Sequence, residues 1–133
     1  MNIKKYLLAS VAVYVAFQAI DFVFHGIIMA DTYKALSHLW RSDMMSYMWI
    51  MYLAGVVLAG AFTYIFVKGY EGKGLLEGVR FGIVAGLFMN VMGMFGQYAM
   101  YPVPFSLTLI WFGYGMAQYV IGGVIAAAIY RPE

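Results

Sequence analysis

Long apolar stretches alternate with short polar segments along this chain. Four stretches stand out, at about residues 6–29, 45–67, 79–98 and 105–130. Each has roughly the 20 residues that a helix needs to cross a ~30 Å hydrocarbon core. A lone strand would leave its backbone polar groups without partners in lipid, so we interpret all four as helices. The pattern predicts an all-α membrane protein, with residues 1–133 forming one transmembrane domain built as a four-helix bundle.

The composition agrees with this pattern. Of the 133 residues, 65% are hydrophobic and 11% are charged, whereas soluble domains have about 45–50% apolar and about 25% charged residues. A net charge of +2 gives no indication of nucleic-acid binding. The chain contains no cysteine, which excludes disulfides, thiolate metal sites and iron–sulfur clusters. The first stretch is too long for a signal-peptide core and lacks a small-residue cleavage site, so we expect an uncleaved first span.

Positive charge is distributed unevenly between the two ends of the predicted helices. One side holds Lys4, Lys5, Lys68, Lys73, Arg80 and Arg131, and the other holds Lys34 and Arg41. Loops rich in Lys and Arg stay in the cytoplasm. We therefore expect a multi-pass protein of the inner (cytoplasmic) membrane with both termini cytoplasmic and with residues 30–43 and 101–104 on the outer side.

The outer loop at residues 30–43 has its own apolar periodicity. Ala35, Leu36, Leu39 and Trp40 follow helical spacing, and a tryptophan is a typical anchor at a membrane interface. This spacing predicts a short amphipathic helix on the membrane surface. It would act as a simple connector, or as a lid or a docking element for a partner.

Small residues recur four positions apart within the predicted spans. The pairs are Gly55/Ala59, Gly82/Gly86, Gly122/Ala126 and Gly123/Ala127. Such pairs let helix backbones approach closely in lipid. They indicate a compact bundle without showing which helices are partners.

The first span carries a polar stripe. Tyr14, Gln18, Asp21 and His25 are separated by four, three and four residues, which places them on one helix face. A polar face is costly when it points at lipid, so we expect it to face the bundle or a partner. Ionisable groups inside a membrane usually mark a function, but Asp21 can equally serve as a packing contact between helices.

Two later spans carry similar stripes. The third has Asn90, Met94, Gln97 and Tyr101, and the fourth has Trp111, Tyr114 and Gln118. If all the stripes face inward, the outer half of the bundle contains one polar cluster, with Asp21 as its only carboxylate. The candidate ligand or proton site is therefore Tyr14, Gln18, Asp21, His25, Asn90, Gln97, Tyr114 and Gln118.

Metal, cofactor and catalytic signals are weak. Asp21 and His25 could supply two metal ligands, and His38 a third, but two ligands do not make a site and we expect no metal. The methionines are better explained as flexible filler of apolar space than as a copper path. We find no nucleophile–base pair and no carboxylate pair at catalytic spacing, so the sequence does not favour an enzyme. No motif in the sequence indicates a particular cofactor. Glu77 and Arg80, three residues apart, are expected to pair in the first turn of the third span.

Several short strings resemble small bacterial four-helix integral membrane proteins that have no assigned activity. These strings are Asp21-x3-His25-Gly26, Leu39-Trp40-Arg41, Lys73-Gly74-x2-Glu77-Gly78-x-Arg80 and Ile129-Tyr130-Arg131-Pro132. The resemblance extends over most of the chain and implies architecture only. Small multidrug exporters also carry a carboxylate in their first helix, but the residues around Asp21 differ. Quinone-reducing thiol enzymes of this size need cysteines that this chain lacks.

Two functional hypotheses follow from the sequence. In the first, the protein is a non-catalytic accessory subunit of a larger membrane complex, such as an energy-converting one, which fits its size and its abundant apolar surface. In the second, it is a small oligomeric binding or transport protein that holds a proton, a cation or a polar ligand around Asp21 and His25. Both imply contact with the lipid bilayer and with other membrane subunits or a second copy, and neither implies nucleic acid.

Overall fold

A computed structural model describes residues 1–131, and every regular element in that range is a helix. The long helices are α1 (Ile3–Val23), α3 (Met48–Lys68), α4 (Leu75–Met100) and α5 (Phe105–Ile129). The first is extended by a π-helical segment, Phe24–Ile28, and the second is preceded by a 3-10 turn, Met44–Tyr47. With these extensions, all four are long and apolar enough to cross a membrane, which confirms the prediction. The fourth predicted stretch, at about residues 105–130, agrees closely with α5. Helix α4, in contrast, begins about four residues before the predicted start of the third stretch.

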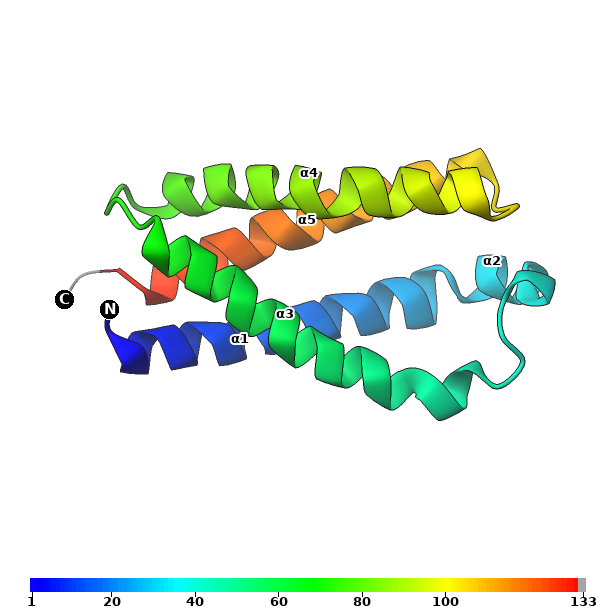
Figure 1. Ribbon diagram of the computed structural model, residues 1–133, viewed down its shortest axis with the longest axis horizontal. Helices are drawn as coiled ribbons and strands as arrows, with labels where there is room; N and C mark the ends of the chain where they lie inside the picture. The colour runs from blue at the N-terminus through cyan, green and yellow to red at the C-terminus, as the bar shows by residue number, and fades with distance from the viewer. Residues whose placement is uncertain (132–133) are drawn as a thin grey trace.

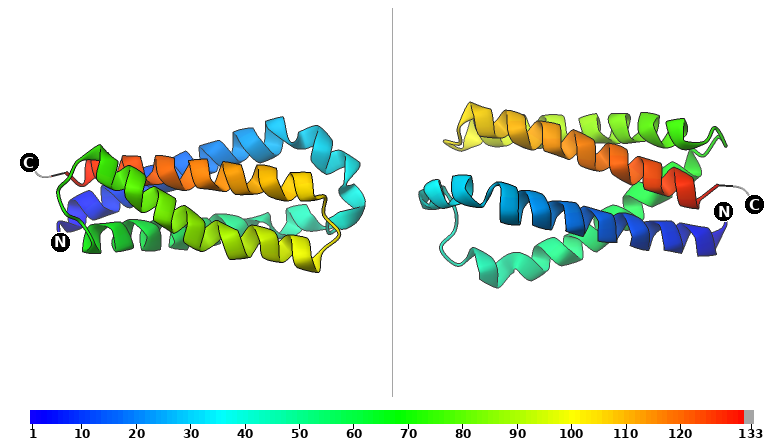
Figure 2. Two further views of the ribbon diagram at one scale, coloured as in Figure 1. Left: turned by 90° about the horizontal axis from the view of Figure 1, so that it is seen from above. Right: turned by 180° about the vertical axis from the view of Figure 1, so that it is seen from behind.

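The helices form two pairs, α4 with α5 and α1 with α3, and the pairs contact each other mainly between α1 and α5. Helices α4 and α5 lie side by side over their whole length, α1 packs against α5, and α3 packs mainly against α1 (Figure 1). Helix α3 is inclined to the others, so that it lies near α4 at one end and moves away from it toward the other (Figures 1 and 2). The arrangement is therefore a bundle in which α3 and α4 scarcely touch.

The two ends of the bundle differ in charge. Both termini and the loop between α3 and α4 lie at one end, here called the terminal end, and the short helix α2 (Ala30–Ala35) lies at the other, the α2 end (Figure 1). The terminal end carries Lys4, Lys5, Lys68, Lys73, Arg80 and Arg131, and the α2 end carries Lys34 and Arg41. The fold thus gathers the cations into the two groups that the sequence predicts.

Glycines allow the close contact between α4 and α5. A Cβ atom added at Gly78 would lie 2.6 Å from the carbonyl carbon of Gly123, and one at Gly82 would lie 2.5 Å from the Cα of Val120. Gly122 faces the other way, because a Cβ there would meet the ring of Phe17 at 2.7 Å. Small residues on two faces of α5 therefore let helices approach it from both sides, as expected for packing in lipid.

The buried side chains form two clusters. The larger one joins α1, α3 and α5 toward the terminal end and consists of Val13, Phe17, Ala59, Phe62, Phe66, Val67, Tyr119, Ala126 and Ala127. The smaller one, at the α2 end, consists of Met29, Val103, Leu107 and Trp111. Polar groups near the α2 end are thus separated from the terminal end by an aromatic and aliphatic core.

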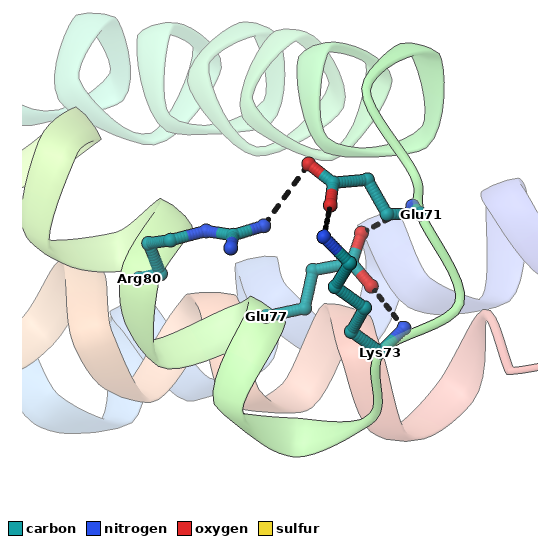
Figure 3. Close-up of polar contacts among 4 residues, drawn as sticks. All are labelled: Glu71, Lys73, Glu77 and Arg80. Atoms are coloured by element: carbon teal, nitrogen blue, oxygen red, sulfur yellow. Dashed lines mark hydrogen bonds and ion pairs between the residues drawn. The ribbon is translucent and has the colours of Figure 1, made fainter.

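The loop between α3 and α4 is organised by a buried carboxylate. Glu77 is 4% exposed and accepts hydrogen bonds from the backbone N–H groups of Glu71 and Lys73, at 2.6 and 2.8 Å (Figure 3). Gly72 and Gly74 adopt φ values of +74° and +80°, which a residue with a Cβ rarely adopts. Glu77 therefore ties the loop to the first turn of α4.

This geometry corrects the expected pairing of Glu77 with Arg80. Arg80 instead donates from a guanidinium nitrogen to Glu71 Oε1 at 3.1 Å, and Lys73 pairs with the same carboxylate (Figure 3). Lys73, followed by Arg80, holds the pKa of Glu71 below its usual range. The predicted pair does not form because the buried Glu77 carboxylate accepts backbone N–H groups with both oxygens, while Arg80 is exposed and meets Glu71 of the loop.

The outer loop contains a short helix, and its amphipathic character stays a prediction. Helix α2 is followed by a 3-10 turn, Ser37–Leu39. Leu36, Leu39 and Trp40 pack against the smaller buried cluster rather than standing away from the bundle. Contact of this segment with a membrane surface stays a prediction.

The close packing of α4 on α5 can be tested at Gly78. We expect Gly78→Ala to lower the free energy of unfolding by about 1–3 kcal/mol, the usual cost of overpacking a rigid contact. Gly93→Ala, on the same helix but with no atom within 4 Å of the added Cβ, is the matched control. It should leave the stability unchanged or raise it slightly, since alanine favours a helix. Thermal unfolding in mild detergent measures both, and equal midpoints for the two variants would contradict the role assigned to Gly78.

Candidate functional site

Asp21 is the centre of a polar cluster between α1 and α5. It lies within the candidate membrane span Ile3–Ile28 and is only partly buried. Tyr114 and Gln118, one turn apart on α5, donate hydrogen bonds to its Oδ1, with the Gln118 amide at 2.9 Å. Within residues 1–131, no hydrogen bond is made to Asp21 Oδ2. One carboxylate oxygen is therefore held by α5 and the other is unoccupied by protein donors.

A second group of polar contacts centres on Tyr33 of α2. Its hydroxyl lies 2.6 Å from His25 Nδ1 and accepts a hydrogen bond from Trp111 Nε1 at 2.8 Å. Trp40 Nε1 donates to the Tyr33 carbonyl oxygen at 3.1 Å. Three separate elements, α1 with its π-helical end, the outer loop and α5, therefore meet at one tyrosine.

The contact with Trp111 fixes one role of the Tyr33 hydroxyl. An indole N–H can only donate, so the Tyr33 oxygen accepts from Trp111, whereas the direction of the hydrogen bond between Tyr33 and His25 Nδ1 depends on the His25 tautomer. Burial raises the pKa of the Tyr33 phenol, the Trp111 hydrogen bond opposes this, and the charge of Asp21 adds to it. Tyr33 consequently stays protonated at neutral pH.

Aromatic contacts connect the two groups. The rings of Phe24 and Tyr114 stack with centroids 3.8 Å apart and planes 4° from parallel, and the His25 ring meets Tyr114 edge-on at 5.2 Å. Tyr114 therefore has its hydroxyl on Asp21 and its ring against His25. The result is a continuous line of side chains from Asp21 through Tyr114 and His25 to Tyr33, running toward the α2 end.

The backbone around His25 is irregular. Residues Phe24–Ile28 form a π-helical turn that begins three residues after Asp21, with Met29 donating its N–H to the Phe24 carbonyl at 2.8 Å. Single π-turns of this kind occur frequently at functional sites. The wider turn changes the direction of His25 relative to an ordinary helix, and no feature of the sequence pattern predicts it.

The predicted stripe on α1 divides between two neighbours. Asp21 and His25 face α5 and α2, whereas the Tyr14 hydroxyl donates to the Tyr52 carbonyl of α3 at 3.3 Å. The Gln18 amide also lies against α3, only 3.0 Å from where a Cβ at Gly55 would be. The stripe is a single face, but α3 and α5 flank α1, so its two halves meet different helices.

The stripe on α4 does not reach this site. Asn90 is buried against Gly115 of α5, where its Nδ2 has no hydrogen-bond partner in the described part of the chain. Gln97 and Tyr101 are exposed, and Met94 packs against the smaller buried cluster. These groups are separated from Asp21 because α5, which contacts both α1 and α4, lies between those two helices. Of the eight candidate site residues, the structure therefore brings Asp21, His25, Tyr114 and Gln118 together.

Tyr33 is the site residue that sequence reasoning missed. It lies in the outer loop, outside every predicted span, and carries no charge. One available signal was its spacing of three and seven residues from Leu36 and Trp40, which places the three on one helical face. All three indeed pack against the buried cluster around Trp111.

The site offers few metal ligands. Across residues 1–131, no three or more His, Asp or Glu side chains come together as a metal-binding group, and Asp21, His25 and His38 form no such set. His38 is exposed in the 3-10 turn of the outer loop. The groups nearest Asp21, the Tyr114 hydroxyl and the Gln118 amide, donate hydrogen bonds to it. Such donors stabilise a carboxylate and do not bind a cation.

Comparison with protein-family models, with curated proteins and with solved structures gives no match.

The contacts of Tyr33 can be tested by removing its hydroxyl. Tyr33→Phe deletes the hydrogen bonds to His25 and Trp111, so we expect the free energy of local opening of α2 to fall by ~1 kcal/mol. The open state of α2 would then be populated about 5–10 times more often. Amide hydrogen exchange of peptides covering residues 30–40 measures this opening. Tyr47→Phe is the control, because the Tyr47 ring contacts Arg41 through its face, which phenylalanine retains. Equal exchange in both variants would show that Tyr33 does not hold α2.

Proposed function

We propose that this protein is a small membrane transport protein whose Asp21 binds and releases a proton. The observation that carries the proposal is a carboxylate within a membrane span that has one oxygen fixed by Tyr114 and Gln118 and the other free. Ionisable groups inside a membrane are costly in free energy and usually mark ion or proton pathways. The two donors from α5 hold the carboxylate in place in either protonation state.

A proton suits this site better than a metal cation. Calcium takes 6–8 oxygen ligands and magnesium close to six, whereas Asp21 is the sole carboxylate in the cluster. The line Asp21, Tyr114, His25 and Tyr33 consists of groups that can each carry a hydrogen. Hydrogen bonds join Asp21 to Tyr114 and His25 to Tyr33, while Tyr114 and His25 meet only through their rings, so proton exchange between Asp21 and the α2 end requires a water molecule at that step.

An aromatic core separates Asp21 from the terminal end in this conformation. Toward the terminal end, α1 continues with Phe17 and Val13, which are buried against Phe62 and Tyr119. Transport would therefore require a second conformation in which this aromatic core opens. The inclined α3, which has few contacts with α4 and α5, is the element best placed to move.

We propose further that the protein lies in the inner membrane with its terminal end in the cytoplasm, which the distribution of cations supports. The chain has no native cysteine, so Lys4→Cys and Lys34→Cys, both at exposed positions, form a matched pair. A membrane-impermeant maleimide should label Lys34→Cys in intact bacterial cells and Lys4→Cys only after permeabilisation. The reverse pattern would invert the proposed orientation.

The proton site can be tested with Asp21→Asn in proteoliposomes that contain a pH-sensitive dye. Under an imposed membrane potential, we expect wild-type protein to move protons and the variant to reduce the rate by about tenfold or more, since asparagine cannot ionise. Asp31→Asn, which changes an exposed carboxylate in α2, should behave as wild type.

An accessory-subunit role is the second candidate, and the separation of α3 from α4 favours it, because it leaves the four helices incompletely packed against one another. If Asp21→Asn and Asp31→Asn give equal rates, and larger unrelated subunits co-purify with the wild type in mild detergent, the accessory role replaces the transport proposal.

A further inference from the structure

A groove runs between α3 and α4, in the half of the bundle nearer the terminal end. Its volume is about 370 Å³, and every residue that lines it is aliphatic, aromatic or methionine. Ala61 and Ile65 form one wall, Val84 and Phe88 form the other, and Phe62 and Tyr119 form the floor. Phe88 is 83% exposed, so the groove opens sideways, toward the position of the lipid.

The fold keeps this groove open. The glycine face of α4 is used against α5, which leaves the bulkier face of Val84 and Phe88 toward α3. The loop held by Glu77 joins α3 and α4 at the terminal end, while the inclination of α3 separates the helices beyond it (Figures 1 and 3). The two helices are therefore joined at the terminal end and apart beyond it.

Cations flank the end of the groove that faces the terminal end. Lys68 follows Ala61 and Ile65 at helical spacing, and Arg80 precedes Val84 by one turn. Both side chains are exposed at the helix ends, with the Lys68 ammonium 5.5 Å from the centre of the Tyr64 ring. The wall of each helix thus ends in a positive charge.

The acidic groups at this end only partly neutralise the cations. Glu71 accepts from Arg80 and pairs with Lys73, while the charge of Glu77 is directed at backbone N–H groups (Figure 3). Among the ionised side chains of residues 68–80, three cations face two carboxylates, for a net charge of +1. An anionic group of a ligand in the groove would therefore meet an attractive potential.

We infer that the groove binds one acyl chain of an anionic phospholipid, with its phosphodiester placed between Lys68 and Arg80. Apolar walls suit a hydrocarbon chain, and basic residues at the cytoplasmic surface attract anionic head groups. The site lies beyond the aromatic core from Asp21, so the inference does not depend on the proton proposal.

Native mass spectrometry of delipidated protein, titrated with phosphatidylglycerol or phosphatidylcholine, tests this site. Ala61→Trp fills the groove and should weaken phosphatidylglycerol binding by about tenfold, whereas Val57→Trp, on the same helix at an exposed position outside the groove, should not. Lys68→Gln with Arg80→Gln should weaken it by about fivefold for each charge removed. Lys34→Gln with Arg41→Gln, at the α2 end, is the control for loss of two charges.

Three results would overturn the inference. The first is equal phosphatidylglycerol binding by Ala61→Trp and Val57→Trp, which would show that the groove holds no chain. The second is equal affinity of the wild type for phosphatidylglycerol and phosphatidylcholine, which would remove the role of Lys68 and Arg80. The third is a second polypeptide, either another copy or a different protein, that Ala61→Trp releases from the wild-type complex while lipid binding is unchanged.

Discussion

Close contact between the backbones of α4 and α5 is the constraint on which the other helices depend. In lipid, apolar side chains gain little by associating, so van der Waals contact at small residues has to supply the attraction. Gly78 and Gly123 bring α4 against one face of α5, and Gly122 admits the ring of Phe17 on another. Helix α5 thereby becomes the shared neighbour of α1 and α4 and separates those two helices along their length.

The same central position explains the polar site. Because α5 faces α1 directly, its polar residues Tyr114 and Gln118 are the ones that can reach Asp21. A charge inside a membrane is costly unless polar groups meet it, and the donors on α5 meet it from one side only. The aromatic core beneath Asp21 separates it from the terminal end, and His25 and Tyr33 lie on its other side, toward the α2 end.

Helix α3 has the opposite role. It packs mainly on α1, and its link to α4 is the loop that Glu77 holds at the terminal end. Away from that loop, α3 and α4 diverge, which produces the apolar groove and leaves α3 the least constrained of the long helices. Tight packing on one side of the bundle and loose packing on the other are thus two consequences of where the glycines lie.

The sequence by itself determined that there are four helices of membrane-spanning length, which cations share an end, and which small residues permit close packing. These are properties of hydropathy and helical period, which act over a few neighbouring residues. Helical period also shows which residues share a face, but not which helix covers that face. Only the tertiary structure decided that Asp21 meets Tyr114 and Gln118, that Asn90 and Gln97 lie elsewhere, that Tyr33 joins the site, and that Glu77 caps a loop rather than pairing with Arg80. Each of these depends on contacts between segments far apart in the chain, which local patterns do not specify.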